Sequence, residues 1–518
     1  MKLQNVPYNT YPTNVFLILG GEGPIVPEMT RRMPFISVAN ESKALVIALE
    51  LRYYGKSIPV PDLSTDNLMY LSTDQILEDI AEFQIEFSRQ FGLTEAKWIV
   101  MGCSYAGTLA AWYRMKYPHM VGAAISSSAP LKAVTRFDAY DKKVRAALGP
   151  KCSSAFKSLF DHIEYELMEL KNQSIKDVFS CNRSIDDRMF LFMLSESLSY
   201  SVQYNSKFKL LANICPLFIK HSNNMSALLD MFIGYIKNMF LFQGTTCDDY
   251  NIFTYANTEI DYSGTRQWTW QMCSEYGWFL VASEKNVTLK SSLLNETWWQ
   301  NEVCRILFGR PMKPFVEKIN LLYGPDNIKQ LSSVLYTNGD LDPWSTLSVS
   351  TSCDAPISNI LNIAGESHCA NWYGETQEDS WDLKNARLLG NAFLRQFIKS
   401  DCKRDQCERK GGICLPKKDT ERTASSMCVF PDVRCSGNNR YFSKLDLDDN
   451  TITNITYVDP AETNNTTNDP NGFDSDPPTS SAASATFQIN AGVDTIFFPF
   501  QCPTFITLFS IISLIQLI

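Results

Sequence analysis

The first 130 residues alternate short apolar runs with polar segments. The runs at 15–19, 45–49 and 98–101 each end in glycine or a charged residue. Short apolar runs of this kind are typical of strands buried on both faces of a parallel sheet. We therefore predict three parallel strands in this part of the chain.

One amphipathic helix is predicted between the second and third runs. Its start has the pattern of a capping box, Ser72-Thr73-Asp74-Gln75. Apolar residues then recur at helical spacing, at Ile76, Ile80, Phe83, Phe87 and Phe91. Strands that alternate with helices on this scale predict a parallel sheet with helices on both faces.

The pattern changes from residue 132 to 328. Long amphipathic stretches such as 185–240 dominate there, and strand-like alternation is rare, so we expect an inserted all-helical cap domain. Strand patterns return at 333–336 and 359–363, followed by a helical segment over 382–399. The sheet domain is therefore expected in two parts, 1–131 and 329–400, on either side of the insertion.

Three further segments are predicted after residue 400. Residues 401–436 hold five cysteines within 34 residues, which favours a small disulfide knot. Residues 437–492 are rich in Asn, Thr, Ser, Asp and Pro and are expected to form a disordered, glycosylated stalk. Residues 493–518 form a hydrophobic tail.

The tail resembles a lipid-anchor attachment signal. Residues 496–518 are uncharged, and small residues at 480–485 precede them across a spacer. A retained membrane span is the alternative, but Pro499 and Pro503 interrupt the stretch and no basic residue follows it. Because residues 1–14 contain no apolar stretch of signal-peptide length, we expect a natural start upstream of this chain.

Composition limits the partners and the compartment. The formal charge is -9 with a pI near 5.2, and no long basic cluster occurs, which argues against nucleic acid as a partner. Fifteen cysteines outside CxxC pairs and nine N-x-S/T sequons indicate a disulfide-bonded glycoprotein of the secretory pathway. An odd number of cysteines leaves at least one thiol unpaired. No metal site and no cofactor are predicted.

A nucleophile elbow is predicted around Ser104. The sequence Gly102-Cys103-Ser104-Tyr105-Ala106 follows the third apolar run and precedes a helical segment over 108–117. A serine on a strained strand-to-helix turn needs such small neighbours and such flanking elements. A plain turn would explain the motif if these flanking elements were absent.

A serine nucleophile needs a base, and the chain has only four histidines. His119, His162 and His221 lie in segments typical of a surface, whereas His368 lies in a loop directly after the strand pattern at 359–363. Hydrolases with a nucleophile elbow carry the base in such a loop, last in chain order.

The acid of a triad is expected between Ser104 and His368. The stretch Asn338-Gly339-Asp340-Leu341-Asp342-Pro343 follows a strand pattern and offers two carboxylates, of which we assign Asp342 as the acid that orients His368. The alternative is a turn without a catalytic role, which the composition of this stretch also fits.

Substrate-stabilising groups are expected at two loops. The backbone amides of Tyr105 and of Gly21, in the glycine-rich loop after the first strand, are the candidate oxyanion donors. Glu22 in the same loop is a candidate ligand for a substrate ammonium group, although a solvated loop carboxylate is the simpler interpretation.

Longer stretches resemble a known family of serine peptidases, which includes prolyl carboxypeptidase, lysosomal dipeptidyl peptidase and thymus-specific serine protease. The matching stretches, in family order, are LILGGEGPI, ELRYYGKSIP, YLSTDQILEDIAEF, GCSYAGTLAAWYRMKYP, WQMCSEYGWF, INLLYGPDNI, TNGDLDPWS and ESHCANWYG. The last resembles most the thymus-specific branch. The resemblance implies an α/β-hydrolase fold with a helical cap, and exopeptidase action on peptides, often next to proline.

The same match implies catalytic roles for Ser104, Asp342 and His368. Departures occur at Cys103 and Ala106, where the family usually has glycine, and at Leu51, where it usually has histidine. These departures put local packing in doubt more than the triad. The resemblance leaves open which peptide terminus is trimmed, whether a homodimer forms, and whether the location is the cell surface or a lysosome-like compartment.

Two alternatives remain beside the peptidase. An esterase or lipase could use the same fold and triad, and a non-catalytic surface glycoprotein could keep the fold without the reaction.

Overall fold

The computed structural model describes most of the first 399 residues. It covers 12–399 except 27, 32–34, 285–287, 352–353 and 356–357, together with the short strands β9 (Ile413–Pro416), β10 (Ser426–Val429) and β11 (Thr495–Ile496). Apart from these strands, the predicted disulfide knot, stalk and tail lie outside the described residues. No helix in the described part of the chain is long and apolar enough to span a membrane.

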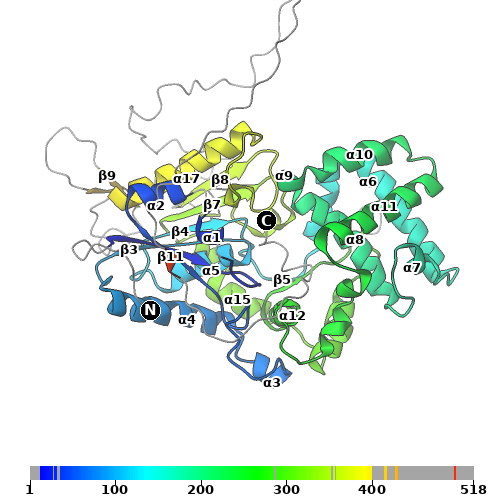
Figure 1. Cartoon of the computed structure of the whole chain (residues 1–518), viewed down its shortest axis with the longest axis horizontal. Coiled ribbons are helices and arrows are strands. Elements are labelled where there is room, and N and C mark those ends of the chain that lie inside the picture. Colours follow the sequence, from blue (N-terminus) through cyan, green and yellow to red (C-terminus); the bar gives the residue numbers. More distant parts are fainter. Residues whose placement is uncertain are drawn as a thin grey trace, which may run out of the picture.

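A parallel sheet forms the centre of the fold (Figure 1). Its strand order is β11, β2 (Leu45–Leu49), β1 (Asn14–Leu19), β3 (Lys97–Cys103), β4 (Ala123–Ser127), β7 (Val334–Gly339) and β8 (Asn359–Ile363), with every neighbouring pair parallel. The strands at 15–19, 45–49 and 98–101 were predicted from apolar runs, and all are found. Strand β4 was missed, because its sequence AAISS has only one large apolar side chain.

Both faces of the sheet are buried, as the continuous apolar runs require. Along β1 the side chains alternate between two separate cores: Val15 and Leu17 belong to one, and Phe16 and Ile18 to the other. Helices α4 (Thr73–Phe91) and α5 (Tyr105–Lys116) contribute to the first core. Helices α2 (Ile36–Glu41) and α17 (Trp381–Lys399) contribute to the second. The sheet therefore lies between two helical layers.

The start of α4 agrees only in part with the predicted capping box. The Ser72 side chain accepts a hydrogen bond from the Gln75 amide at 3.4 Å, as a helix cap does. The Gln75 side chain, however, accepts a hydrogen bond from Arg52. The reciprocal half of the box is therefore replaced by a contact with another segment.

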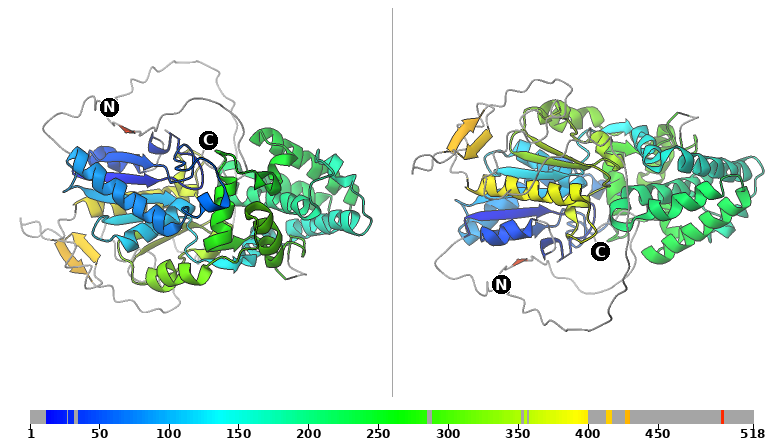
Figure 2. Two further views of the ribbon diagram at one scale, coloured as in Figure 1. Left: turned by 90° about the horizontal axis from the view of Figure 1, so that it is seen from below. Right: turned by 90° about the horizontal axis from the view of Figure 1, so that it is seen from above.

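The long helices of the insertion lie to one side of the sheet (Figures 1 and 2). They are α6 (Asp138–Met168), α8 (Asp187–Gln203), α10 (Leu210–Lys220) and α11 (Met225–Gln243), and two disulfides, Cys152–Cys215 and Cys181–Cys247, cross-link this region. The disulfides bear out the prediction that the cysteines pair.

The later part of the inserted segment returns to the sheet domain. Strand β6 (Gly277–Phe279) pairs with β5 (Val134–Arg136), so the segment is not purely helical. On α15 (Val316–Tyr323), the Tyr323 hydroxyl donates a hydrogen bond to Asp74 of α4 at 2.5 Å. A parallel sheet with helices on both faces and a helical insertion after β4 is the α/β-hydrolase fold, as predicted.

Candidate active site

Ser104 lies on a sharp turn between β3 and α5. Its backbone has φ 60° and ψ -130°, in a region that serine seldom occupies. The Ser104 amide donates to the Ser127 carbonyl at the end of β4, at a distance of 2.9 Å. The turn is therefore tied to the neighbouring strand, and the serine is presented at the carboxyl end of the sheet.

Two glycines make this turn possible. A Cβ atom at Gly102 would lie 2.3 Å from the carbonyl carbon and oxygen of Ala106, and one at Gly107 would lie 2.8 Å from the Ser127 carbonyl. Both distances are shorter than side-chain atoms tolerate. The helix α5 can approach β3 and β4 this closely only because these positions lack a side chain.

Asp342 and His368 are in direct contact. The Asp342 Oδ2 atom lies 2.8 Å from His368 Nδ1, and both side chains are fully buried. Asp342 follows β7, and its second oxygen accepts a hydrogen bond from the Trp344 amide at 2.9 Å. This arrangement favours the imidazole tautomer in which Nδ1 carries the proton and Nε2 has a lone pair.

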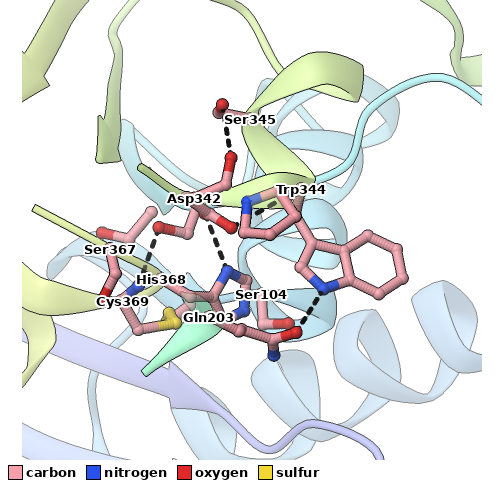
Figure 3. A network of polar contacts seen from close by, with 12 residues as sticks. Ser104, Gln203, Asp342, Trp344, Ser345, Ser367, His368 and Cys369 are labelled. Carbon is pink, nitrogen blue, oxygen red and sulfur yellow. Dashed lines mark hydrogen bonds and ion pairs between the residues drawn. A yellow bond between two sulfur atoms is a disulfide. The ribbon is translucent and has the colours of Figure 1, made fainter. Parts of the chain in front are cut away.

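Ser104 lies beside this pair (Figure 3). The residues next to Ser104 and His368 in the chain, Cys103 and Cys369, form a disulfide, and a ring nitrogen of His368 lies within 4.8 Å of both sulfurs. Nε2 of His368 is buried and has no hydrogen-bond partner among the described residues. The structure thus brings the three predicted residues together, without a hydrogen bond between Ser104 and His368.

The loop that carries His368 is held by the helical insertion. The His368 amide donates to the Gln203 carbonyl at the end of α8 at 2.9 Å, and the Gln203 side chain accepts from the Trp344 indole at 3.1 Å. Ser206 and Ser367 exchange two further hydrogen bonds. Gln203 was not predicted as a site residue, because it is the last residue of an amphipathic helix that is distant in the chain from His368.

The two residues predicted to supply the oxyanion donors, Tyr105 and Gly21, both lie close to Ser104. Tyr105 is the first residue of α5, so its amide has no acceptor within the helix. Gly21 follows β1 and lines the same cavity of 1050 Å³ as Ser104. The Tyr105 side chain is buried, and its hydroxyl contacts Tyr276 at 3.0 Å and Gln271 at 2.7 Å. These contacts fix the residue that would supply one of the donors.

Glu22 lies at the junction of two cavities, and Ser104 lines both of them. Burial raises the pKa of the Glu22 carboxyl above its ordinary value, and a backbone hydrogen bond and the nearby His368 offset part of this rise. A cation bound beside Ser104 would favour the ionised form of this carboxyl group.

The smaller cavity has a volume of 180 Å³ and is mostly aromatic. Its walls come from the sheet domain and from the insertion, and they include Tyr105, Tyr140, Phe192, Tyr200, Trp268, Trp278 and Trp344. These residues were not predicted, because the sequence pattern around each is that of an ordinary core residue in its helix or strand. The cavity can hold a small apolar group beside Ser104.

One group of described residues has the spacing of metal ligands, namely Cys103, His368 and Cys369. Both sulfurs are joined in the Cys103–Cys369 disulfide, so they are not available as thiolates. The three histidines predicted to lie at the surface, His119, His162 and His221, are not part of this group, and His119 is exposed.

Comparisons with known proteins show which family the chain resembles. The chain is 30% identical to the thymus-specific serine protease of Mus musculus, over 76% of this chain and 82% of that protein. It is 31% identical to the probable serine protease EDA2 of Arabidopsis thaliana, over 68% of this chain and 72% of that protein. It is 25% identical to the lysosomal Pro-X carboxypeptidase of Bos taurus, over 74% of this chain and 81% of that protein.

Among solved structures, the proline iminopeptidase of Mycobacterium smegmatis aligns with a TM-score of 0.36 at 12% identity, over 75% of this chain and 91% of that chain. The family model of serine carboxypeptidase S28 matches residues 3–389. A match over most of the chain, together with these relatives, establishes the resemblance seen in the sequence. The chain belongs to the S28 family of serine peptidases and is a hydrolase of peptide bonds.

Proposed function

We propose that the protein is a serine exopeptidase in which Ser104 is the nucleophile, His368 the base and Asp342 the orienting acid. The observation that carries this proposal is the buried 2.8 Å contact between Asp342 and His368, with the other ring nitrogen unpartnered beside an elbow serine. In this arrangement the imidazole can accept one proton and hold it in reach of the leaving group.

The reaction would proceed through an acyl-enzyme. Ser104 Oγ attacks the scissile carbonyl carbon while its proton passes to Nε2 of His368, and the Tyr105 and Gly21 amides stabilise the oxyanion. The imidazolium then gives the proton to the leaving amine, and the C–N bond breaks. A water molecule, deprotonated by His368, hydrolyses the ester and restores Ser104. Loss of one oxyanion donor typically costs about 3 kcal/mol of transition-state stabilisation.

Among the described residues, no hydrogen bond joins Ser104 to His368. Catalytic hydrogen bonds are often long before substrate binds and shorten in the Michaelis complex. Because the His368 loop is held by the insertion through Gln203 and Ser206, substrate bound between the insertion and the sheet domain can influence this distance.

The aromatic cavity supports a preference for proline or another small apolar residue at the cleaved bond. Its volume of 180 Å³ leaves room for little more than one such ring beside Ser104. Residues of the insertion, Tyr140 and Phe192 among them, form part of its wall and limit how far a peptide extends. The name of the Pro-X carboxypeptidase relative points to the same residue preference.

Glu22 supports binding of a peptide's amino terminus. Its carboxyl group lies between the two cavities, where an Xaa-Pro substrate with its proline ring in the aromatic cavity would place its ammonium group. A bound ammonium ion would favour the ionised carboxylate against the effect of burial. Release of dipeptides from the amino terminus is thus the first reaction to test, with carboxyl-terminal trimming as the alternative.

The compartment is proposed to be the secretory pathway or a lysosome-like organelle. The four disulfides among the described residues favour an oxidising site of folding, and one relative is named lysosomal. The lipid anchor or membrane span at 493–518 remains a prediction, because the structure describes only Thr495 and Ile496 of this segment.

Labelling with a fluorophosphonate tests the triad directly. The folded, disulfide-bonded protein is expected to be labelled on Ser104, and the Ser104→Ala variant is expected to remain unlabelled. Absence of label on the folded wild-type protein would refute the catalytic proposal.

A substrate panel then tests the specificity. Fluorogenic Xaa-Pro amides with a free and with a blocked amino terminus, carboxyl-terminal Pro-Xaa peptides, and simple esters are compared. Glu22→Gln is expected to raise KM about tenfold for the free Xaa-Pro amides only, because one charged contact is lost. Equal effects on free and blocked substrates would remove Glu22 from ammonium binding. Turnover of esters alone would favour the esterase alternative.

A further inference from the structure

A disulfide joins the nucleophile elbow to the loop of the base. Cys103 directly precedes Ser104, and Cys369 directly follows His368. The two cysteines are 266 residues apart in the chain, and their Cα atoms lie 6.0 Å apart. No other disulfide among the described residues includes a neighbour of Ser104, Asp342 or His368. This bond therefore sets the spacing of two separate chain segments at the site.

Both ends of the bond lie in constrained backbone. Ser104, next to Cys103, has φ 60°, and Cys369 itself has φ 57°, so both have a positive φ that residues other than glycine seldom adopt. The Cys369 amide donates to Ser128 Oγ at 2.9 Å, just beyond β4. Asn371 donates to Ser127 Oγ at 3.0 Å. The sheet domain thus holds the residues after His368 by one covalent bond and a small number of hydrogen bonds.

The opposite side of the same loop is held by the helical insertion. Its contacts are the hydrogen bonds from His368 to Gln203 and between Ser367 and Ser206. Without the disulfide, the position of His368 relative to Ser104 would depend on hydrogen bonds to two separate parts of the structure. A displacement of about 1 Å in a catalytic group can lower a rate about a hundredfold.

We propose that Cys103 and Cys369, joined as a disulfide, are positioning residues that fix the distance between Ser104 and His368. This inference rests on the proposed roles of those two residues. The covalent link acts on the transition state, in which a proton must pass between Oγ and Nε2, and it does not contact the aromatic cavity that binds substrate. Its loss should therefore lower kcat and leave KM nearly unchanged.

The first test replaces the bond in the full chain. Cys103→Ser, Cys369→Ser and the double variant are compared with the wild-type protein in kcat, KM and the rate of fluorophosphonate labelling. Each is expected to show a 10- to 100-fold lower kcat and labelling rate, with KM changed less than threefold. The double variant should equal the single variants, because either substitution removes the same bond.

The matched control is the Cys152→Ser/Cys215→Ser variant, which removes a disulfide within the insertion. It is expected to lower thermal stability while the kcat per folded molecule stays within twofold of wild type. A merely structural role of Cys103–Cys369 would give the same result as this control. A folded Cys103→Ser/Cys369→Ser variant with wild-type kcat would overturn the proposal.

A second test covers the case in which these variants fail to fold. Cys103 and Cys369 both line the large cavity, so a small dithiol can reach the bond in the folded wild-type enzyme. The dithiol is oxidised to its cyclic disulfide, and the protein gains two thiols that are alkylated and quantified by mass spectrometry. Activity is measured before alkylation and is expected to fall in proportion to the fraction of molecules in which these two cysteines are reduced. Full activity with both cysteines completely reduced would overturn the proposal.

Failure of the proposed function gives a different result. If wild-type protein is not labelled at Ser104, the triad itself is wrong. If it is labelled and the loss of the disulfide leaves the labelling rate unchanged, the triad stands and the positioning role does not.

Discussion

Replacement of Asp342 by asparagine would test how the buried pair works. Asn has nearly the shape of Asp, but it has one acceptor oxygen and one NH₂ group in place of two acceptors. The Trp344 amide donates to Asp342 at 2.9 Å and would keep the asparagine oxygen on its side. The NH₂ group would then face His368 Nδ1, at the position of the oxygen that now lies 2.8 Å away.

The expected magnitude follows from the tautomer. An NH₂ donor makes Nδ1 an acceptor, so the single proton of the neutral imidazole moves to Nε2. Nε2 can then no longer take the proton of Ser104. In serine hydrolases this change lowers kcat about 10⁴-fold, or about 5 kcal/mol in activation free energy. We expect kcat of Asp342→Asn to fall by that amount, with KM nearly unchanged.

The assay is steady-state hydrolysis of the best fluorogenic substrate, with folding checked by thermal melting. The matched control is Asp340→Asn, which changes the other carboxylate of the same loop. Asp340 is exposed and accepts a hydrogen bond from the Gly365 amide at 2.8 Å, so its replacement should change kcat less than threefold. A well-folded Asp342→Asn variant with kcat within tenfold of wild type would refute the tautomer argument.

Two further predictions concern buried groups of the scaffold. Burial raises the pKa of Glu275 from 4.5 to about 7, although Thr73 donates a hydrogen bond to its carboxylate. The folded state therefore binds the proton more tightly than the unfolded state does. The resulting stabilisation is complete below pH 4.5 and is lost as the pH rises through 7. Glu275→Gln should therefore remove a pH-dependent contribution of about 3 kcal/mol to the free energy of unfolding. The difference between the urea unfolding free energies at pH 4.5 and 7.5 should be smaller in the variant than in the wild-type protein, and an equal difference would contradict the prediction. Gly102→Ala should prevent formation of the elbow, because its Cβ would lie 2.3 Å from the Ala106 backbone. The control Ala106→Gly should lower the free energy of unfolding by only about 1 kcal/mol. Soluble yield and melting temperature compare the two variants, and equal stability would refute the crowding argument.

Local patterns in the sequence account for much of the fold. The strand at 15–19, the helix that begins after Ser72 and the turn at Ser104 follow from apolar periodicity, capping and small residues at fixed offsets. These are properties of neighbouring residues, so they can be read without knowledge of the rest of the chain. Strand β4 was not predicted, because its small side chains give little hydrophobic periodicity.

Contacts between distant segments could not be predicted in the same way. The sequence placed Cys103 in the elbow motif and marked it as a departure from the family pattern, whereas the structure joins it to Cys369. Gln203 has the appearance of an ordinary helix residue, yet its carbonyl holds the amide of His368. The partner of each residue depends on how the inserted helices pack on the sheet, and no local rule encodes that packing.

The sequence by itself determined the chain order of Ser104, Asp342 and His368, because each follows a recognisable strand and the carboxyl ends of parallel strands meet at one edge of the sheet. Only the tertiary structure showed that Asp342, already assigned from the sequence, contacts His368 while Asp340 accepts from the Gly365 amide, and that aromatic side chains from two regions enclose a cavity beside Ser104. The physical reason is that side-chain partnership is set by distances of a few ångströms across the fold, which residue spacing along the chain does not fix.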